Sequence, residues 1–421
     1  MNFLTAEQAR KIAAEYGTPV YVYSEEVLIR AAEELLACPG VDSVRYAMKA
    51  LPTKAILWLL HQAGLKIDAS SGYEANRALA AGIPACDIQL TCQEMPDKIY
   101  YLASAGVQFN ACSLLQLRSY GQMLGKTPRP RHVSIRINPG LGSGHCGKTN
   151  VGGPSSSFGI WHEKLQEAKE IADQYGLTIS RLHTHIGSGS DPAVWVKVAG
   201  MSLAIAEQLP EVQVLNLGGG LKVGRMHGEQ SIDLQTCGQA IRQAFQDFAA
   251  RTGRYLKLEI EPGTYVVAAA GALICTVIDM VDTRPDENGL QFLKVNSGMT
   301  EIARPTLYGA QHPMELVPAD FKPRPLTPNQ NYVVSGHCCE SGDILTPAPG
   351  DPNTVATRAF PAAEIGDLLV IDYAGAYCSG MPMTGYNSFP AAAEVLLQQN
   401  GAWRLIRRRQ TLEQLTENER F

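Results

Sequence analysis

Short runs of apolar and β-branched residues recur along the first 270 positions, and segments with a helical period lie between them. Such runs predict strands, and the segments between them predict helices. Eight strand–helix units in alternation are typical of a parallel sheet that closes into a barrel. The predicted strands cover residues 44–49, 66–70, 88–91, 107–111, 132–138, 181–186, 214–217 and 256–261. The predicted helices cover residues 53–63, 73–81, 93–105, 162–175, 193–208 and 237–252.

After Ala270 the pattern changes to short strand-like runs that alternate with turns rich in Pro and Gly, which is an all-β pattern without helices between the strands. These runs cover residues 273–280, 291–295, 331–335, 367–371 and 402–406. We therefore expect an α/β fold with a (β/α)8 TIM-type barrel over 25–270 and a C-terminal all-β domain over 271–421, which residues 1–24 join. Thr5 and Gln8 have the spacing of a capping box and predict a short helix near the N-terminus.

Composition and charge exclude several classes of protein. The 421 residues include 36 Lys and Arg and 41 Asp and Glu, so the net charge is −5 with His neutral, which argues against a nucleic-acid partner. Residues 1–17 carry four charged side chains and lack the apolar core of a secretory signal. The longest apolar stretch, 265–278, is shorter than the about 20 residues of a membrane span. Ten Cys without a C-x-x-C pair indicate a reduced chain, so we expect a cytoplasmic protein.

Reactive side chains collect at the carboxyl ends of the predicted barrel strands, where barrel enzymes carry their chemistry. These residues are Lys49, Asp68, His185, Ser188, the triplet Gly218, Gly219 and Gly220, and Glu261. A lysine at a strand end is either solvated or, when desolvated, able to form a Schiff base. A glycine triplet is either a tight turn or a place where backbone amides approach a phosphate. An acid such as Glu261 can keep a pyridinium nitrogen protonated.

Three motifs allow a second interpretation. Residues 142–149 match the phosphate-loop pattern G-x-x-x-x-G-K-[ST], which would make the chain an NTPase, but the residues after Thr149 cannot continue the helix that this loop needs. His183 and His185 lack further spaced ligands, so we favour a structural pair on one strand face and predict no metal site. The run from Cys339 to Asp343 (CESGD) is either a turn or a functional loop.

Taken together, the sequence resembles the fold-type III pyridoxal-phosphate-dependent decarboxylases, the group of ornithine and diaminopimelate decarboxylases, and is closest to the bacterial diaminopimelate decarboxylases. The resemblance covers nearly the whole chain, with the motifs in the order of the family. They are YAMKA, NPG…GHCGKTN…FGIW, HIGSGSD, GGGL, EPG, ARPTLYGA, CESGD, GAY, YNS and RLIRRRQTLEQL.

The resemblance implies that pyridoxal 5'-phosphate is the cofactor and that Lys49 binds it as a Schiff base. His185 would stack on the cofactor ring, and Glu261 would pair with the ring nitrogen. The remaining positions that the resemblance assigns to cofactor binding, several of them to the phosphate, are Asp68, Ser188, Gly218, Gly219, Gly220, Gly263, Thr264 and Tyr377.

The resemblance also implies an amino-acid substrate and a homodimer, in which the CESGD loop of one subunit completes the site of the other. Cys339 would donate the proton that replaces CO2, and Glu340 would contact the distal amine of the substrate. Arg304 and Tyr308 would bind the distal carboxylate, and Tyr377 would also face the substrate.

The sequence departs from the family near this site. Thr264 follows EPG, where most members of the family have Arg, and Phe389 follows YNS, where Arg is usual. A Thr cannot clamp a carboxylate as a guanidinium does. Two interpretations follow: decarboxylation of meso-diaminopimelate to L-lysine in lysine biosynthesis, or decarboxylation of another amino acid, such as D-ornithine, D-lysine, carboxynorspermidine or a secondary-metabolite precursor. A racemase and a binding protein for the cofactor without turnover are further alternatives.

Overall fold

Backbone contacts divide this chain into two units, which are described separately. The computed structural model describes residues 1–125, 131–143, 150–187, 191–284, 289–320, 325 and 327–420. The barrel unit comprises residues 29–223 and 230–266, and the sheet unit comprises residues 1–28, 224–229 and 267–421. The domain boundaries at 24/25 and 270/271 stay a prediction.

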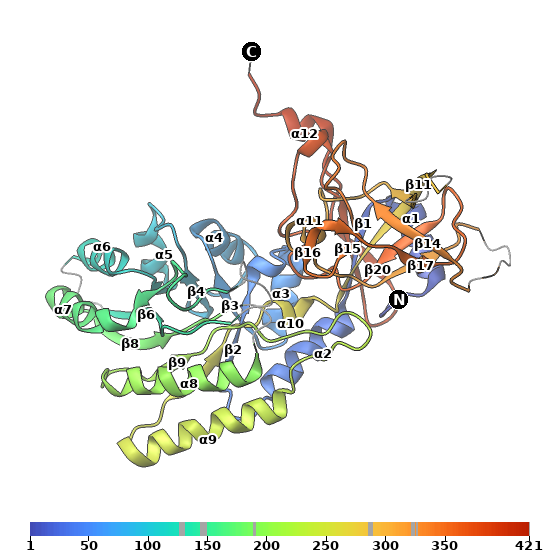
Figure 1. The fold of residues 1–421 in the computed structure, drawn as a ribbon. Coiled ribbons are helices and arrows are strands. Elements are labelled where there is room, and N and C mark those ends of the chain that lie inside the picture. The colour runs from blue at the N-terminus through green and yellow to red at the C-terminus, as the bar shows by residue number, and fades with distance from the viewer. Residues whose placement is uncertain are drawn as a thin grey trace. The chain divides into compact units, whose positions relative to one another are not determined.

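The barrel unit contains eight parallel strands that close on themselves (Figure 1). They follow one another in the order β5-β4-β3-β2-β10-β9-β8-β6, and pairing of β6 with β5 completes the ring. The strands are β2 (Ser43–Ala47), β3 (Lys66–Ala69), β4 (Ile88–Thr91), β5 (Gln108–Ala111), β6 (His132–Asn138), β8 (Thr178–His183), β9 (Val214–Asn216) and β10 (Lys257–Ile260). The predicted α/β barrel is thus confirmed.

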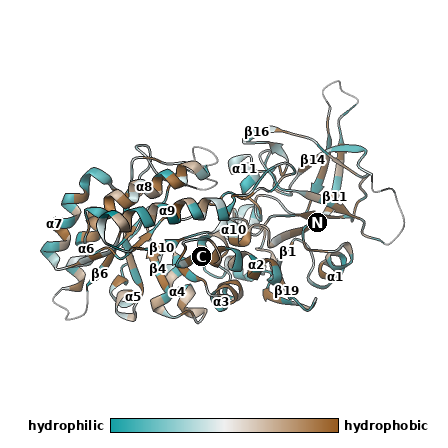
Figure 2. Cartoon of the chain, turned by 90° about the horizontal axis from the view of Figure 1, so that it is seen from below, coloured by the Kyte–Doolittle hydropathy of each residue, from teal (hydrophilic) through white to brown (hydrophobic). Residues whose placement is uncertain are grey.

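Helices follow the barrel strands, and their sequences show why they form. In Figure 2, α7 and α9 carry both hydrophobic and hydrophilic bands, as expected of helices with one buried face. The helices of this unit are α3 (Lys54–Gln62), α4 (Gly72–Ala80), α5 (Ile99–Ala105), α6 (Leu114–Leu124), α7 (Leu165–Tyr175), α8 (Pro192–Glu207) and α9 (Leu234–Thr252). Short 3-10 turns are η1 (Met48–Ala50), η2 (Ala85–Asp87) and η4 (His162–Lys164), and β7 (Ile160–Trp161) pairs with β6. Helices α2 (Glu25–Leu36) and α10 (Thr264–Val267) carry the chain between the units.

Three details of the predicted barrel are wrong. The strand expected at 181–186 begins and ends three residues earlier, at Thr178–His183. The helix expected from residue 93 begins only at Ile99, after Pro96, because a proline restricts the residue before it. Helix α6 was not predicted, although Ser113 caps it by accepting the amide proton of Gln116 at 3.1 Å.

The sheet unit is built around β1 (Val20–Ser24), which lies between β11 (antiparallel) and β19 (parallel). Its core contains Val22, Ile274, Val370 and Val395, all fully buried. The other strands are β11 (Gly271–Asp282), β12 (Gln291–Val295), β13 (Met314–Val317), β14 (Gln330–Ser335), β15 (Pro347–Ala348), β16 (Asp351–Val355), β17 (Arg358–Phe360), β18 (Leu368–Ile371), β19 (Ala393–Leu397) and β20 (Trp403–Arg407). The predicted all-β character is therefore correct for the sheet.

This unit also contains helices: one was predicted near the N-terminus, whereas those within residues 271–421 were not expected. Helix α1 (Ala6–Tyr16) has the predicted capping box between Thr5 and Gln8. Helices α11 (Arg304–Tyr308) and α12 (Leu412–Thr416) have five residues each, and η5 (Tyr386–Ser388) has three. Segments this short do not complete the periodic pattern from which helices are predicted. Within the part of the chain that the structure describes, no helix has both the length and the apolar character needed to cross a bilayer.

Candidate active site

The mouth of the barrel brings together the reactive residues predicted from strand ends. Lys49 lies in η1 directly after β2, Asp68 in β3, His185 just after β8 and Glu261 just after β10. Lys49 is exposed in the single chain, whereas Asp68 and Glu261 are buried. Ser188 lies outside the described residues. These residues lie at the same mouth because the carboxyl ends of parallel barrel strands meet at one rim.

The glycine triplet after β9 is a turn held between two neighbouring strand ends. The Gly219 amide donates to Nδ1 of His185 at 3.3 Å, and the Glu261 amide donates to the Gly218 carbonyl at 2.8 Å. A Cβ atom on Gly218 would come within 2.7 Å of the His185 Cβ, and one on Gly219 would overlap the Glu261 carbonyl. Gly218 and Gly220 also have positive φ. Only glycine allows this backbone to lie so close to both strands.

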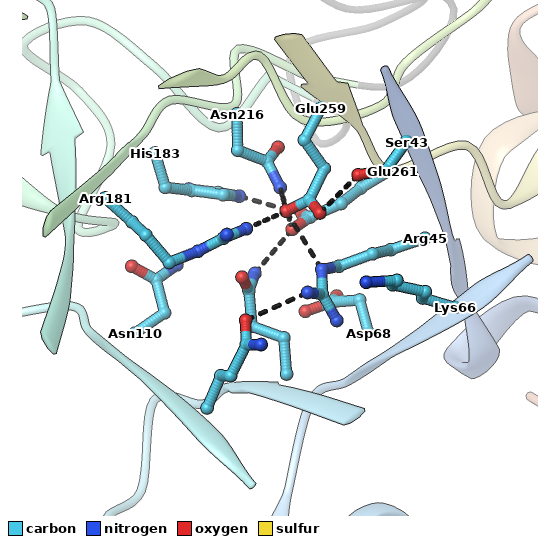
Figure 3. A network of polar contacts seen from close by, with 12 residues as sticks. Ser43, Arg45, Lys66, Asp68, Asn110, Arg181, His183, Asn216, Glu259 and Glu261 are labelled. Atoms are coloured by element: carbon cyan, nitrogen blue, oxygen red, sulfur yellow. Dashed lines mark hydrogen bonds and ion pairs between the residues drawn. The ribbon is translucent and has the colours of Figure 1, made fainter. Parts of the chain in front are cut away.

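The Glu261 carboxylate is the centre of a buried polar network (Figure 3). Its Oε1 accepts from Gln89 Nε2 and Asn216 Nδ2, both at 2.6 Å, and its Oε2 lies 2.8 Å from His183 Nε2. Burial alone raises the pKa of Glu261, but the charge and hydrogen bond of His183 outweigh it and lower the pKa. Glu261 is therefore ionised. A carboxylate has about four acceptor positions, so one is left for a further donor.

Asp68 lies in the same network with the opposite protonation preference. Thr91 Oγ1 donates to Asp68 Oδ1 at 2.8 Å, and Thr91 in turn accepts from Gln89 at 3.3 Å. Burial and the negative charge of Glu261 raise the pKa of Asp68 well above its ordinary value. The two carboxyl groups of the mouth thus have pKa values shifted in opposite directions, a division that is common in catalytic sites.

His185 is neutral and has a defined tautomer. Burial, followed by the positive charges of Arg136 and Lys49, lowers the pKa of His185 well below its ordinary value. Because Nδ1 accepts the Gly219 amide proton, the ring proton is on Nε2. A flat, uncharged ring held at one edge is suited to packing against another aromatic ring.

The residues after Glu261 approach the first barrel strand closely. Gly263 lies where an added Cβ would come within 3.3 Å of the Ala47 carbonyl, and the Ala47 amide donates to the Pro262 carbonyl at 3.2 Å. Thr264 is partly exposed and opens α10. Thr264 thus directly follows the residues that contact the end of β2.

A second buried network lies one step deeper in the barrel and was not predicted. Glu259 accepts from Ser43 Oγ at 2.7 Å and from Asn216 Nδ2 at 2.9 Å (Figure 3). Its carboxylate lies 2.9 Å from Arg45 Nε and is also bound by Arg181 Nη2. Asn216 connects this network to the Glu261 network. The signal that marks these residues is a polar side chain inside an otherwise apolar strand.

The two acidic residues of the CESGD loop, Asp343 and Glu340, have different environments. Asp343 is buried and accepts the amide protons of Met299 at 2.7 Å and Cys338 at 2.9 Å. Glu340 is exposed. The Gly342 amide and the Tyr386 hydroxyl donate to its carboxylate, and these hydrogen bonds lower the pKa of Glu340. Asp343 therefore fixes the loop, and Glu340 is presented to the outside.

Cys339 is exposed at the tip of this loop, and its amide donates to Asn387 Oδ1 at 2.8 Å. The neighbouring Cys338 is partly buried, and burial followed by the charge of Asp343 raises its pKa to about 12. Phe389 stacks on His337 with the ring centroids 3.6 Å apart. Where the family has Arg, this chain therefore has an aromatic ring that packs against the start of the loop.

Arg304, Tyr308 and Tyr377 also lie in the sheet unit. Arg304 and Tyr308 are the first and last residues of α11, and Arg304 Nη1 lies 3.0 Å from Nε2 of the buried His312. Tyr377 adopts a left-handed backbone with φ of 56°, which is unusual for a residue with a side chain and is more common at functional sites. Tyr377 is partly exposed.

Comparison with known proteins identifies the family. The model of the pyridoxal-dependent decarboxylases, pyridoxal binding domain, matches residues 26–268, which is more than half of the chain. This chain belongs to the pyridoxal-dependent decarboxylases. It is similar to the diaminopimelate decarboxylase of Escherichia coli K12, with 37% identity over 428 residues, 98% of this chain and 96% of that protein.

Solved structures of decarboxylases have the same fold. A crystal structure of diaminopimelate decarboxylase matches with a TM-score of 0.90 and 36% identity, covering 98% of this chain and 96% of that one. The enzyme of Helicobacter pylori complexed with L-lysine matches with a TM-score of 0.84 and 27% identity, covering 97% and 98%. The chain is therefore a carboxy-lyase that uses pyridoxal phosphate.

The residues at the barrel mouth of this decarboxylase fit that cofactor. Glu261 is ionised and has an acceptor position left, as a protonated ring nitrogen requires. The glycine turn leaves no room for a side chain at Gly218 or Gly219. Two buried nitrogen atoms, His183 Nδ1 and Arg136 Nη2, have no hydrogen-bond partner among the described residues. No group of three His, Cys, Asp or Glu that could hold a metal occurs within the described ranges.

Proposed function

We propose that this decarboxylase converts meso-diaminopimelate to L-lysine and CO2. The observation that carries the proposal is the buried Glu261 carboxylate, held by His183, Gln89 and Asn216 on the same rim as Lys49 and His185. The similarity to diaminopimelate decarboxylases over nearly the full chain also supports the proposal. The work of the enzyme would be lysine biosynthesis in the cytoplasm.

The barrel unit would hold the cofactor with the residues described above. Lys49 would bind its aldehyde carbon, His185 would lie against its ring, and Glu261 would accept a hydrogen bond from its protonated ring nitrogen. The phosphate would be held by the glycine turn of residues 218–220 together with Ser188 and Tyr377. Asp68, Gly263 and Thr264 would border the cofactor.

When bound, pyridoxal phosphate supplies a cationic ring that takes up the electron pair left by CO2. The network of Gln89, Asn216 and His183 keeps Glu261 ionised, so that Glu261 holds the ring proton in place. Burial and the charge of Glu261 raise the pKa of Asp68, which disfavours a second negative charge beside the ring. A neutral His185 contributes a packing surface without competing for the proton.

The sheet unit would supply the remaining groups. The thiol of Cys339 would give its proton to the carbon that CO2 has left, and the thiolate would recover a proton from solvent. Glu340 would bind the distal amine of the substrate, and Arg304, Tyr308 and Tyr377 would bind its carboxylate end. We propose a homodimer in which the exposed loop with Cys339 and Glu340 serves the barrel of the other protomer.

A second candidate is decarboxylation of another amino acid, such as D-lysine or D-ornithine. Thr264 favours it, because Thr cannot bind a carboxylate through two parallel hydrogen bonds. Phe389 favours it as well, because its ring stacks on His337 in place of an arginine charge.

One panel assay distinguishes the two candidates. The purified protein is loaded with pyridoxal phosphate, and CO2 release is measured with meso-diaminopimelate, D-lysine, D-ornithine and L-ornithine. Release from meso-diaminopimelate alone supports the first proposal. Release from a basic D-amino acid without activity on meso-diaminopimelate overturns it. Lys49→Ala should abolish both CO2 release and the visible absorbance of the bound cofactor. A Lys49→Ala variant that retained the absorbance would refute the assignment of Lys49.

A further inference from the structure

Two arginines of the sheet unit act electrostatically on each other and on the same buried histidine, His312, and one of them was not singled out from the sequence. Arg225 belongs to the segment 224–229, and Arg304 opens α11. Burial, followed by the positive charge of Arg304, lowers the pKa of Arg225 to about 9. The Nε atom of Arg225 is buried and has no hydrogen-bond partner among the described residues.

The groups around these arginines do not neutralise them. Arg304 donates to Nε2 of His312, whose Nδ1 lies 3.1 Å from the Asp372 carbonyl, so the ring proton is on Nδ1. Burial, followed by the charges of Arg304 and Arg225, lowers the pKa of His312 well below its ordinary value, so His312 is neutral. Tyr373 and Cys378 are the other nearby groups.

Few carboxylates of the described chain act on Arg225 and Arg304. Within the described ranges, neither Arg225 nor Arg304 has a carboxylate at ion-pair distance. The acid that acts on Arg225 is Glu229, and its carboxylate accepts the backbone amide protons of Arg225 at 2.8 Å and Met226 at 3.2 Å.

Two like charges in a poorly solvated position repel each other and lose hydration, unless an anion is bound between them. Guanidinium groups bind carboxylates through paired hydrogen bonds, and each added charge-assisted bond strengthens the binding. A pair of arginines without a protein carboxylate is therefore suited to binding an anionic ligand.

On the basis of the proposed function, we propose that Arg225 is a specificity-determining residue that binds the distal carboxylate of the substrate together with Arg304. The substrate class is then an amino acid whose distal end carries a carboxylate, and amino acids that end in an amine alone are disfavoured. This favours meso-diaminopimelate over D-lysine and D-ornithine.

The first test compares the holoenzymes of the wild type, Arg225→Gln, Arg225→Lys and Arg251→Gln. Arg251 forms an exposed ion pair with Glu207 and serves as a surface control. Arg225→Gln should raise KM for meso-diaminopimelate about ten- to a hundredfold with kcat little changed, and Arg225→Lys should recover part of the loss. Any turnover of D-lysine, which lacks the distal carboxylate, should not change. An unchanged KM, or an equal rise for both substrates, would overturn the proposal.

The second test does not depend on turnover. Pimelate, a dicarboxylate without amino groups, is added to each holoenzyme, and the shift of Tm is measured. Pimelate should stabilise the wild type and Arg251→Gln but not Arg225→Gln. If meso-diaminopimelate is not decarboxylated while this difference is observed, the substrate proposal fails and the carboxylate site stands. Equal stabilisation of Arg225→Gln, or none of the wild type, overturns the site. The visible absorbance of the cofactor confirms that each variant is folded, and Arg225→Lys replaces Arg225→Gln if the latter does not fold.

Discussion

The Nε2 atom of His183 lies 2.8 Å from Oε2 of Glu261, and both residues are buried inside the barrel. This contact offsets the effect of burial, which by itself would raise the pKa of Glu261. His183 therefore acts through Glu261 as a positioning residue, although it was predicted only as a structural neighbour of His185.

Replacing His183 should move the acid side of the pH–activity profile. In His183→Asn the charge and hydrogen bond that lower the pKa of Glu261 are lost, so this pKa should rise. Glu261 then becomes protonated at a higher pH, so kcat should fall earlier as the pH decreases. The measurement is kcat against pH, with the exposed His132→Asn as the control. An acid limb at the same pH in His183→Asn and the wild type would contradict the role of His183.

The two adjacent cysteines should differ in their importance. Cys339→Ala removes the proposed proton donor and should lower kcat about 10²–10⁴-fold, as expected for loss of general acid catalysis. Cys338→Ala changes a partly buried thiol that contacts Asp343, and activity should remain near that of the wild type. Steady-state CO2 release measures both. Equal losses in the two variants would show that the effect comes from the loop and not from the Cys339 thiol.

The charge of Glu259 should contribute to stability in a pH-dependent way. Burial raises its pKa, but the charges of Arg45 and Arg181 outweigh this effect and lower the pKa to about 2. Because the pKa is lower in the folded than in the unfolded chain, the stabilisation is complete above the ordinary pKa of 4.5 and is lost as the pH falls toward 2. Glu259→Gln leaves Arg45 and Arg181 buried without an anion and should cost about 3–5 kcal/mol near pH 7.

Urea unfolding at several pH values checks this prediction, with Glu207→Gln as the exposed control. The gap between Glu259→Gln and the wild type should narrow between pH 4.5 and 2. An exposed ion pair such as that of Glu207 contributes little, so Glu207→Gln should unfold within about 1 kcal/mol of the wild type. A gap that stays constant with pH would mean that packing, and not charge, accounts for the loss.

The fixed shape of the CESGD loop should depend on a glycine. A Cβ atom on Gly336 would overlap the carboxylate of Asp343, which holds the amides of Met299 and Cys338. Gly336→Ala should displace this carboxylate and lower kcat by up to ~100-fold, because a shift of about 1 Å in a reacting group has effects of this size. The visible absorbance of the cofactor should be unchanged, because the residues proposed to bind its aldehyde and ring belong to the barrel unit.

Gly200→Ala is the matched control for that variant. Gly200 lies in α8 with open space around the position of an added Cβ, so alanine should be tolerated and should stabilise the helix by about 1 kcal/mol. Activity and Tm are measured for both variants. A Gly336→Ala enzyme with wild-type kcat would show that Asp343 does not have to hold the loop in this position.

The eight-stranded barrel and the rim residues could be predicted from the sequence. Strand and helix periods are local, and parallel strands in a closed barrel place their carboxyl ends together, so Lys49, Asp68 and Glu261 were expected at one mouth. The capping box at Thr5 is likewise local and was confirmed. Such features depend on residues close together in the sequence, so the sequence alone predicts where they lie in the fold.

Only the tertiary structure decided which polar side chains meet. Glu259 is paired with Arg45 and Arg181, which come from strands far away in the chain, and a strand pattern does not say which inward-facing side chains are neighbours. The same holds for Arg225 and Arg304, two arginines on short or irregular segments with no periodic signal. The tertiary structure also decided the pKa values: that of Glu261 is lowered and that of Asp68 is raised, because burial and neighbouring charges differ between the two carboxyl groups.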